Sequence, residues 1–300
     1  MKKRFTMLIF GILMVVVAAG CSSGREKNSN DTAQNEADEE LPSNFVAFGM
    51  YSNERDYIDN GSSLNRETAE NHMVEIEQNL NREVKYLLLA FADYRQVSFY
   101  VDGTEYVKFP FSLDKKGTRD INISHSQLSD CRELTYLIIP DCEEKVQEDD
   151  IEQLLNISSI YSMRYLLDFG TKFVPEAYKE PQKAIIDQEG IFLSSSEKEQ
   201  EVLTVVKRDF PLYLHIAVKD PEVKDYLFFM LNDWEQVPIG EDFYFYLKND
   251  PSAGWIQEIN VSGMEPDSNF QIVGIPNPFQ DFDFYSNKAV YYTHRIHVVE

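Results

Sequence analysis

The residues that could do chemistry in this chain are serines near lysines, histidines and clustered carboxylates. A Ser-x-x-Lys spacing occurs at Ser112–Lys115 and again at Ser195–Lys198. Enzymes that use such a serine place it at a helix start and need Ser-Asp-Asn and Lys-Thr-Gly partner motifs, and neither motif occurs. His294 and His297 lie three apart on an expected strand, so they face opposite sides and are badly placed to share a metal. We therefore predict no catalytic site.

Carboxylates gather in two expected loops. They are Asp141, Glu143, Glu144, Glu148, Asp149, Asp150 and Glu152 in the first loop, and Asp281 and Asp283 in the second. Calcium takes about six to eight oxygen ligands, so such loops could hold one. However, no EF-hand spacing or other ordered ligand pattern is present. We expect solvated acidic loops, with no metal and no cofactor.

Aromatic residues crowd the second half of the chain. Consecutive strand residues point to opposite faces, so half of each aromatic run cannot lie in the core of a two-layer sandwich. Those side chains either pack between two domains or form a recognition surface for sugar rings or for another protein. The residues expected to carry such a surface are Trp234, Trp255, Tyr244, Tyr246, Phe282 and Phe284.

The N-terminus has the order of an export signal. Lys2, Lys3 and Arg4 precede an apolar run over residues 5–17, and Ala18-Ala19-Gly20-Cys21 follows. A charged head, an apolar body and small residues before a cleavage point are typical of such signals. The alternative, a single membrane-spanning helix, needs ~20 apolar residues, and this run is shorter.

The same stretch resembles the bacterial lipoprotein signal, in which small residues precede an invariant cysteine. The resemblance implies that Cys21 is diacylated and that residues 1–20 are removed. Ala18 departs from the pattern, because leucine is usual at that position. Residues 21–44 are polar and lack aromatics, which predicts a disordered tether with a typical reach of roughly 25 Å.

Charge limits the partners. The formal net charge is -23, from 51 acidic and 28 basic side chains, and such a field repels nucleic acid and anionic lipid. Contact with the membrane is therefore expected through the lipid at Cys21. Cys131 and Cys142 flank one expected strand, and eleven extended steps span roughly 36 Å, whereas bridged Cα atoms lie within about 7 Å. We expect no disulfide between them.

From residue 45 onward the pattern is that of short strands separated by turns. Val97, Phe99 and Val101 alternate with polar residues up to the Asp102-Gly103 hairpin signal. Residues 84–92 are apolar at successive positions, as in a strand that is covered on both faces. Residues 67–79 fit either a helix or a strand. Seven or eight short strands of this kind indicate a β-sandwich.

An internal repeat divides the chain. Five blocks recur in the same order: 86–93 with 213–220, 109–113 with 243–247, 120–124 with 258–262, 134–140 with 270–276, and 163–167 with 293–297. We predict two all-β domains, at 45–172 and 175–300. Their strand count and spacing resemble tandem immunoglobulin-like sandwiches of bacterial surface proteins, without the Cys…Trp…Cys core of antibody domains.

These features together predict a lipid-anchored protein on the extracytoplasmic face of the cell membrane. Its expected role is non-enzymatic binding to an envelope protein or a surface glycan. Two alternatives stay open: a metal-assisted envelope enzyme or enzyme accessory that uses the acidic loops, and a structural subunit of a membrane complex.

Overall fold

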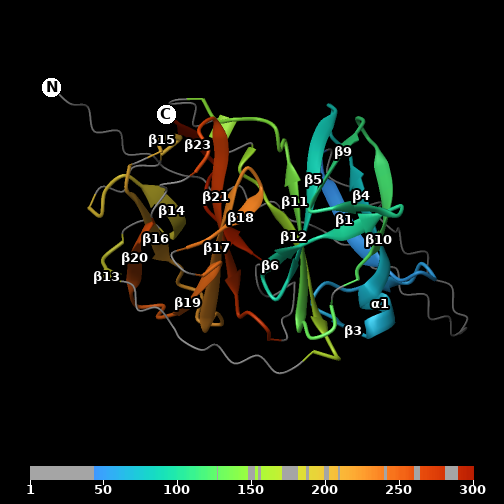
Figure 1. Ribbon diagram of the computed structural model, residues 1–300. Coiled ribbons are helices and arrows are strands. Elements are labelled where there is room, and N and C mark those ends of the chain that lie inside the picture. The colour runs from blue at the N-terminus through green and yellow to red at the C-terminus, as the bar shows by residue number, and fades with distance from the viewer. Residues whose placement is uncertain are drawn as a thin grey trace, which may run out of the picture.

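The computed structural model describes residues 44–126, 128–147, 153–154, 157–170, 182–186, 189–198, 203–208, 210–239, 242–259, 264–280 and 290–300. The chain forms two β-sandwiches that lie side by side, the first coloured blue to green and the second yellow to red in Figure 1. Cys21 and the expected signal and tether lie outside the described residues. Within the described part, no helix combines the length and the apolar character needed to cross a membrane.

The first sandwich consists of sheets A and B. Sheet A has the order β2-β1-β4-β10-β7-β8, with β1 Val46–Tyr51, β2 Tyr57–Ile58, β4 Asn71–Gln78, β7 Phe99–Val101, β8 Thr104–Tyr106 and β10 Thr118–Ser124. Sheet B has the order β3-β12-β11-β5-β6, and β9 also pairs with β5; its strands are β3 Ser63–Leu64, β5 Val84–Ala92, β6 Arg95–Val97, β9 Lys108–Leu113, β11 Glu133–Pro140 and β12 Tyr161–Leu167.

The second sandwich repeats this plan in sheets C and D. Sheet C has the order β13-β20-β16-β14, with β13 Gln182–Ala184, β14 Gly190–Ser194, β16 Leu212–Ala217 and β20 Gly254–Ile259. Sheet D has the order β15-β23-β21-β17-β18, and β19 and β22 also pair with β17 and β21; its strands are β15 Val205–Lys207, β17 Asp225–Asn232, β18 Glu235–Val237, β19 Tyr244–Lys248, β21 Ser268–Pro276, β22 Tyr291–Tyr292 and β23 Ile296–Val299.

The strand connections are those of an immunoglobulin-like fold, as the sequence predicted. In each half, one sheet contains three neighbouring antiparallel strands, β1-β4-β10 in the first half and β14-β16-β20 in the second. In the facing sheet, the strand that comes last in the sequence of that half also pairs in parallel with a short strand from earlier in the same half. That parallel pair is β3 with β12 in the first half and β15 with β23 in the second. The two halves are thus tandem sandwiches with the same core topology, and they differ at one edge, where β10 pairs with β7 but β20 pairs with β13.

The segment that fitted both a helix and a strand forms one of each. The helix α1 spans Arg66–Glu70, and the side chain of Asn65 caps it by accepting a hydrogen bond from the amide of Thr68 at 2.9 Å. The strand β4 follows immediately, and its alternation of buried and exposed residues matches a sheet with one covered face.

The strand ladders correct part of the expected repeat. Tyr86–Asp93 corresponds to residues 226–233, not to 213–220, because β5 and β17 make the same hairpin with β6 and β18. The 109–113 block shifts by two residues, since Phe109 pairs with Leu88 as Phe245 pairs with Phe228. The ladders of β12 and β23 shift the 163–167 block by one residue. The match of Leu134–Pro140 with 270–276 is confirmed by the ladders of β11 and β21. Short apolar strands resemble one another, so only their partners identify true equivalents.

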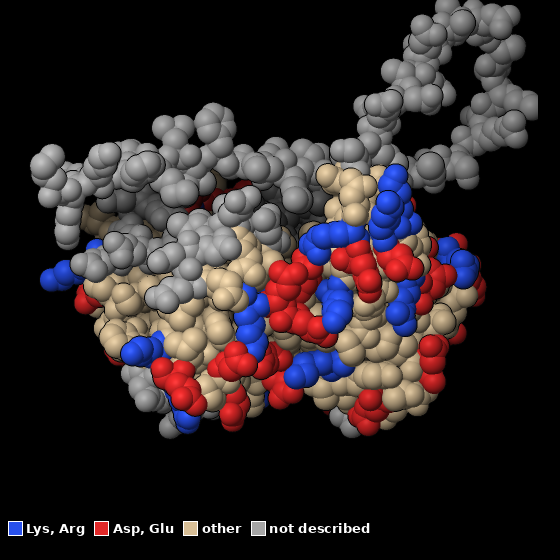
Figure 2. Space-filling model, turned by 90° about the horizontal axis from the view of Figure 1, so that it is seen from above, with Lys and Arg blue, Asp and Glu red and all other residues tan. Residues whose placement is uncertain are grey.

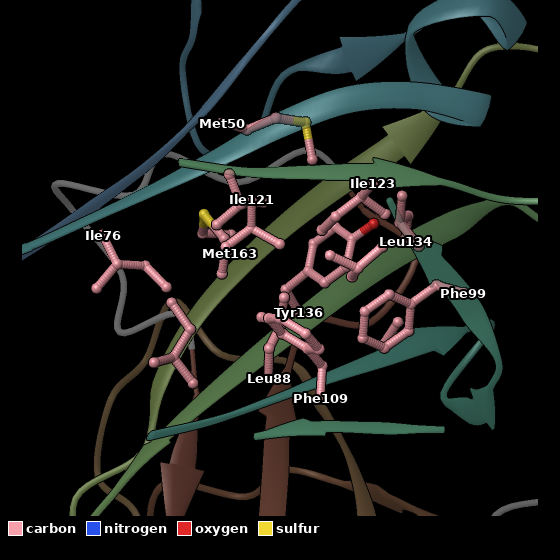
Figure 3. Close-up of a cluster of buried hydrophobic side chains, with 14 of the residues drawn as sticks. Met50, Ile76, Leu88, Phe99, Phe109, Ile121, Ile123, Leu134, Tyr136 and Met163 are labelled. Carbon is pink, nitrogen blue, oxygen red and sulfur yellow. The ribbon is translucent and has the colours of Figure 1, made fainter. Parts of the chain in front are cut away.

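The core of the first sandwich packs apolar side chains around Tyr136 (Figure 3), whose hydroxyl joins two buried histidines. Nδ1 of His72 lies 3.0 Å from the carbonyl of Thr68 and therefore carries the hydrogen. Its Nε2 accepts from the hydroxyl of Tyr136 at 2.7 Å, and Nε2 of His125 donates to the same oxygen at 2.5 Å. The hydroxyl of Tyr136 thus bridges the two histidine rings, and buried polar groups are normally hydrogen-bonded in this way.

These two buried histidines predict a loss of stability in mild acid. Burial lowers the pKa of His72 to about 4 and that of His125 to about 3. Between pH 6.5 and 5 the unfolded chain therefore binds protons that the native chain does not, and the free energy of unfolding should fall by about 1.4 kcal/mol per pH unit for each such histidine. Urea unfolding of wild type and of His72→Asn, measured at several pH values, gives the free energy of unfolding as a function of pH. That free energy should fall less steeply with decreasing pH in the variant. An equal pH dependence in the two proteins would contradict the role of His72.

The two sandwiches share a third core, which lies between sheets B and D. Leu89 and Phe91 from β5 meet Phe229 from β17, and the Phe91 and Phe229 ring centroids are 4.8 Å apart. β5 and β17 are thus buried on both faces, as the sequence predicted for residues 84–92. Among the described residues, sheets B and D thus cover one another, whereas no part of this shared core covers the outer face of sheet A or of sheet C.

Contacts across this interface are reciprocal. The backbone amide of Gln96 donates to the side-chain oxygen of Gln236 at 2.9 Å, and the amide of Gln236 donates back to Gln96 at 2.6 Å. Nε2 of Gln96 donates to the carbonyl of Trp234 at 3.0 Å, and Nε2 of Gln236 donates to that of Tyr94 at 2.8 Å. The repeats therefore pack as two like surfaces related by an approximate two-fold axis.

Candidate functional site

The structure places the expected aromatic surface mostly inside the protein. Trp234 is 6% exposed, and its indole NH donates to the carbonyl of Cys142 in the first sandwich at 2.8 Å. Tyr246, at 4% exposed, lies in the same interface core, and Tyr244 is half-buried at its edge. Trp255, at 8% exposed, belongs to the core of the second sandwich.

Burial therefore removes Trp234, Trp255 and Tyr246 from the expected recognition surface. The alternative, packing between domains, holds for Trp234 and Tyr246, because a second sandwich covers the outer face of sheet D. Phe282 and Phe284 lie outside the described residues.

The described part of the first acidic loop borders a charged hollow of about 440 Å³. It is lined by Arg82, Glu83, Lys85, Asp141, Glu143 and Glu144, and Figure 2 shows acidic and basic side chains mixed along the junction of the two halves. The guanidinium of Arg82 donates to both oxygens of Asp141, at 2.6 and 2.5 Å, and Lys85 pairs with Glu143 at 2.5 Å. The hydrogen bond from Arg82 to Asp141 raises the pKa of Arg82.

These ion pairs determine what the hollow can do. Carboxylates that already accept hydrogen bonds from cations are poor ligands for a further cation. Among the described residues, no group of three or more His, Cys, Asp or Glu side chains is arranged to hold a metal ion. Residues 148–152 and 281–283 of the acidic loops lie outside the described residues. The hollow is a site of charge pairing between β5 and the end of β11.

The outer face of sheet A carries a different cluster. Tyr51, Arg55, Tyr57, Glu75 and Asp120 meet there, and we call them the tyrosine patch. Alternation on three strands brings the patch together, since Gly49 on β1 pairs with Glu75 on β4, which pairs with Asp120 on β10. Tyr57 on β2 lies directly opposite Tyr51. The patch thus spans four neighbouring strands on a face that no other sheet of the described residues covers.

The two tyrosine rings are held at a fixed angle. Their centroids are 5.5 Å apart with an interplanar angle of 68°, an edge-to-face contact. The hydroxyl of Tyr51 donates to Oε1 of Glu75 at 3.2 Å, and partial burial together with this carboxylate raises the pKa of Tyr51. Tyr57 is 46% exposed, one of the few large apolar-bodied side chains that project from the described surface.

The tight turn between β1 and β2 positions the rest of the patch. The hydroxyl of Ser52 accepts hydrogen bonds from the amides of Glu54 and Asp56, each at 3.2 Å. Arg55 adopts a left-handed conformation with φ 69°. Its guanidinium then reaches across the sheet and donates to Asp120 at 3.0 Å.

Glycine 49 makes the position of Tyr57 possible. A Cβ atom at Gly49 would lie 2.8 Å from Cε2 of Tyr57, which is too close for a carbon contact. The Tyr57 ring therefore lies over the strand at this position. Sequence reasoning missed the patch, although a glycine within the first expected strand and two tyrosines flanking a polar turn were visible signals.

Comparisons with known proteins find only distant structural likeness. No family model matches the chain, and no curated protein matches its sequence. Among solved structures, red sea bream transglutaminase matches 87% of this chain at 7% identity and TM-score 0.22, and the chain spans 32% of its length. The Salmonella enterica SafA pilin in complex with the SafB chaperone matches 83% of this chain and 96% of that one, at 10% identity and TM-score 0.25. The Ig1-2 module of the Drosophila receptor tyrosine phosphatase DLAR matches 85% and 97%, at 8% identity and TM-score 0.19.

Proposed function

We propose that this chain is a lipid-anchored extracytoplasmic protein with a non-enzymatic binding role. In this proposal Cys21 carries the lipid, and residues 21–44 separate the anchor from the first sandwich. The tyrosine patch is the recognition surface, and its ligand is a component of the cell envelope. The observation that carries the proposal is the patch itself, an exposed aromatic ring with ordered polar groups on the outer face of sheet A.

Two features support binding over catalysis. Sheets B and D pack against each other in the interface, so a ligand would bind the outer face of sheet A or sheet C. Two of the acidic side chains of the charged hollow, Asp141 and Glu143, are paired with Arg82 and Lys85, which leaves fewer carboxylates for the metal that the alternative enzyme would need. Aromatic and arginine side chains are the groups that most often anchor a ligand or partner.

The test measures how much of the purified full-length chain sediments with the insoluble cell envelope that remains after detergent extraction. The double variant Tyr51→Ala, Tyr57→Ala should bind at least about tenfold more weakly, since loss of two anchoring rings costs more than 1.4 kcal/mol. Phe210→Ala is the matched control, because Phe210 is 52% exposed but lies in the second sandwich. Equal binding by wild type and the double variant would overturn the proposal. When the chain is expressed in cells, Cys21→Ala should prevent removal of residues 1–20 and attachment of the lipid.

A further inference from the structure

We infer that His72, Tyr136 and His125 form an acid-sensitive latch, which holds α1 on the first sandwich at neutral pH and releases it in mild acid while the sheets stay folded. We call these three residues the histidine cluster. α1 connects β3 of sheet B to β4 of sheet A at the lower end of the first sandwich in Figure 1. Its release is a conformational change of the protein alone, independent of the proposed ligand.

The histidine cluster ties α1 to both sheets. Nδ1 of His72 donates to the carbonyl of Thr68 at 3.0 Å, and the backbone amide of His125 donates to the carbonyl of Glu70 at 2.8 Å. Both carbonyls belong to the last turn of the helix. His72 lies on β4 of sheet A, and Tyr136, which bonds both imidazole rings, lies on β11 of sheet B.

The remaining attachments of α1 are small. The helix has five residues, and a helix of that length is not stable by itself in water. β3, which precedes it, pairs with β12 at two positions. Leu64 and Ala69 are the buried side chains of residues 63–70, whereas Arg66 is exposed and lies over the Phe169 ring at 4.3 Å. A segment with so little buried surface is expected to open before the sheets do.

No counter-charge among the described residues faces the two imidazole rings. The other titratable groups of this core are tyrosines and Cys131, and burial raises the pKa of Cys131 to about 11, so they are uncharged between pH 5 and 7. A protonated ring would therefore be an unpaired charge in an apolar core. The charged groups of the surrounding elements lie elsewhere: Arg66 pairs with Glu70 on α1, Glu75 and Asp120 lie on the outer face of sheet A, and Glu133 pairs with Arg164 on the far face of sheet B.

Release of α1 consequently takes up protons. In the closed protein, burial lowers the pKa of His72 to about 4, whereas a solvated histidine has a pKa of about 6.5. Once α1 leaves, the ring of His72 loses its carbonyl partner and meets water, so below pH 6.5 it binds a proton that the closed form does not. For this histidine alone, the equilibrium constant for opening should rise about twentyfold between pH 7 and pH 5.

The test is amide hydrogen exchange of the full-length chain, followed by mass spectrometry at pH 7 and pH 5 and corrected for the intrinsic rate at each pH. The amides of Thr68 and Ala69 bond to Asn65 in the closed helix, so their exchange reports the release of α1. Their opening constant should rise at least about twentyfold at pH 5 and exceed that of β11 by about tenfold or more. An opening constant that does not change with pH would overturn the latch. Equal opening constants for α1 and β11 at pH 5 would also overturn it, because they would show that the whole sandwich unfolds together.

The variant His72→Asn tests which residue takes up the proton. Its side-chain amide can still donate to the carbonyl of Thr68 but does not titrate, so the rise between pH 7 and pH 5 should be severalfold smaller than in wild type. His215→Asn is the matched control, because His215 is equally buried but lies in the second sandwich, where its Nε2 is 2.7 Å from Oγ of Ser194. It should leave the rise unchanged.

A second variant keeps the latch testable where His72→Asn does not fold. His125→Asn also removes one titrating ring, and circular dichroism at pH 7 establishes which variants are folded. A folded His72→Asn or His125→Asn protein that shows the full wild-type rise would overturn the role of the histidine cluster.

Discussion

Replacing Arg164 with methionine should lower the free energy of unfolding by about 3–5 kcal/mol, because it leaves a carboxylate buried without its counter-charge. Arg164 is 0% exposed and Glu133 is 1% exposed, and Nε of the arginine donates to Oε1 of the glutamate at 2.8 Å. Burial alone would lower the pKa of Arg164, but the charge of Glu133 raises it above its ordinary value. Arg164 is therefore charged in the native protein.

The Arg164–Glu133 pair also joins the two sandwiches. Nη1 of Arg164 donates to the carbonyl of Pro276 at 3.0 Å, and Oε2 of Glu133 accepts from the amide of Phe279 at 2.8 Å. Both partners belong to the second half of the chain. Urea denaturation measures the expected loss, and the double variant Arg164→Met, Glu133→Leu should regain most of it, since an apolar pair of similar volume needs no counter-charge.

Arg295 provides a matched comparison, because it occupies the equivalent position on the other side of the interface. It donates to the carbonyls of Pro140 and Asp141, at 3.2 and 2.7 Å, and lies over the Trp234 ring at 4.6 Å. Burial lowers its pKa to about 10. Among the described residues Arg295 makes no salt bridge with a carboxylate, unlike Arg164 with Glu133, so Arg295→Met should cost less than Arg164→Met. The reverse order would show that the carboxylate of Glu133 does not determine the loss.

Replacing Phe91 with alanine should separate the unfolding of the two sandwiches. The ring is fully buried in the interface core, and such a truncation costs about 3–5 kcal/mol. Because that energy couples the domains, we expect calorimetry to show two transitions where wild type shows one.

The control for Phe91→Ala is Phe99→Ala. Phe99 is equally buried, but it lies in the core of the first sandwich and does not reach the interface. Its loss should lower stability while the coupling between domains remains. Two transitions in both variants, or one in both, would contradict a specific role for the interface.

The fold was largely accessible from the sequence. Alternation of apolar and polar residues up to Val101 located β7, and the Asp102-Gly103 signal located the turn between β7 and β8. These patterns succeed because one covered face imposes a period of two on a strand. The repeat was detected, but its first block was matched to β16 and not to β17, since sequence similarity among short apolar strands carries no information on hydrogen-bonding partners.

The sequence by itself determined the sandwich class, the tandem arrangement and the resemblance at Cys21 to a lipoprotein signal. Only the tertiary structure decided which aromatic residues meet solvent. Nothing in the sequence separates Trp234 and Tyr246 from a surface anchor, but the first sandwich covers them. Tyr57 is exposed, since no other sheet of the described residues packs on the outer face of sheet A. Exposure depends on what packs against a face, and that partner comes from residues more than a hundred positions away. The same reason explains the tyrosine patch, since Tyr51, Glu75 and Asp120 become neighbours only when β1, β4 and β10 pair.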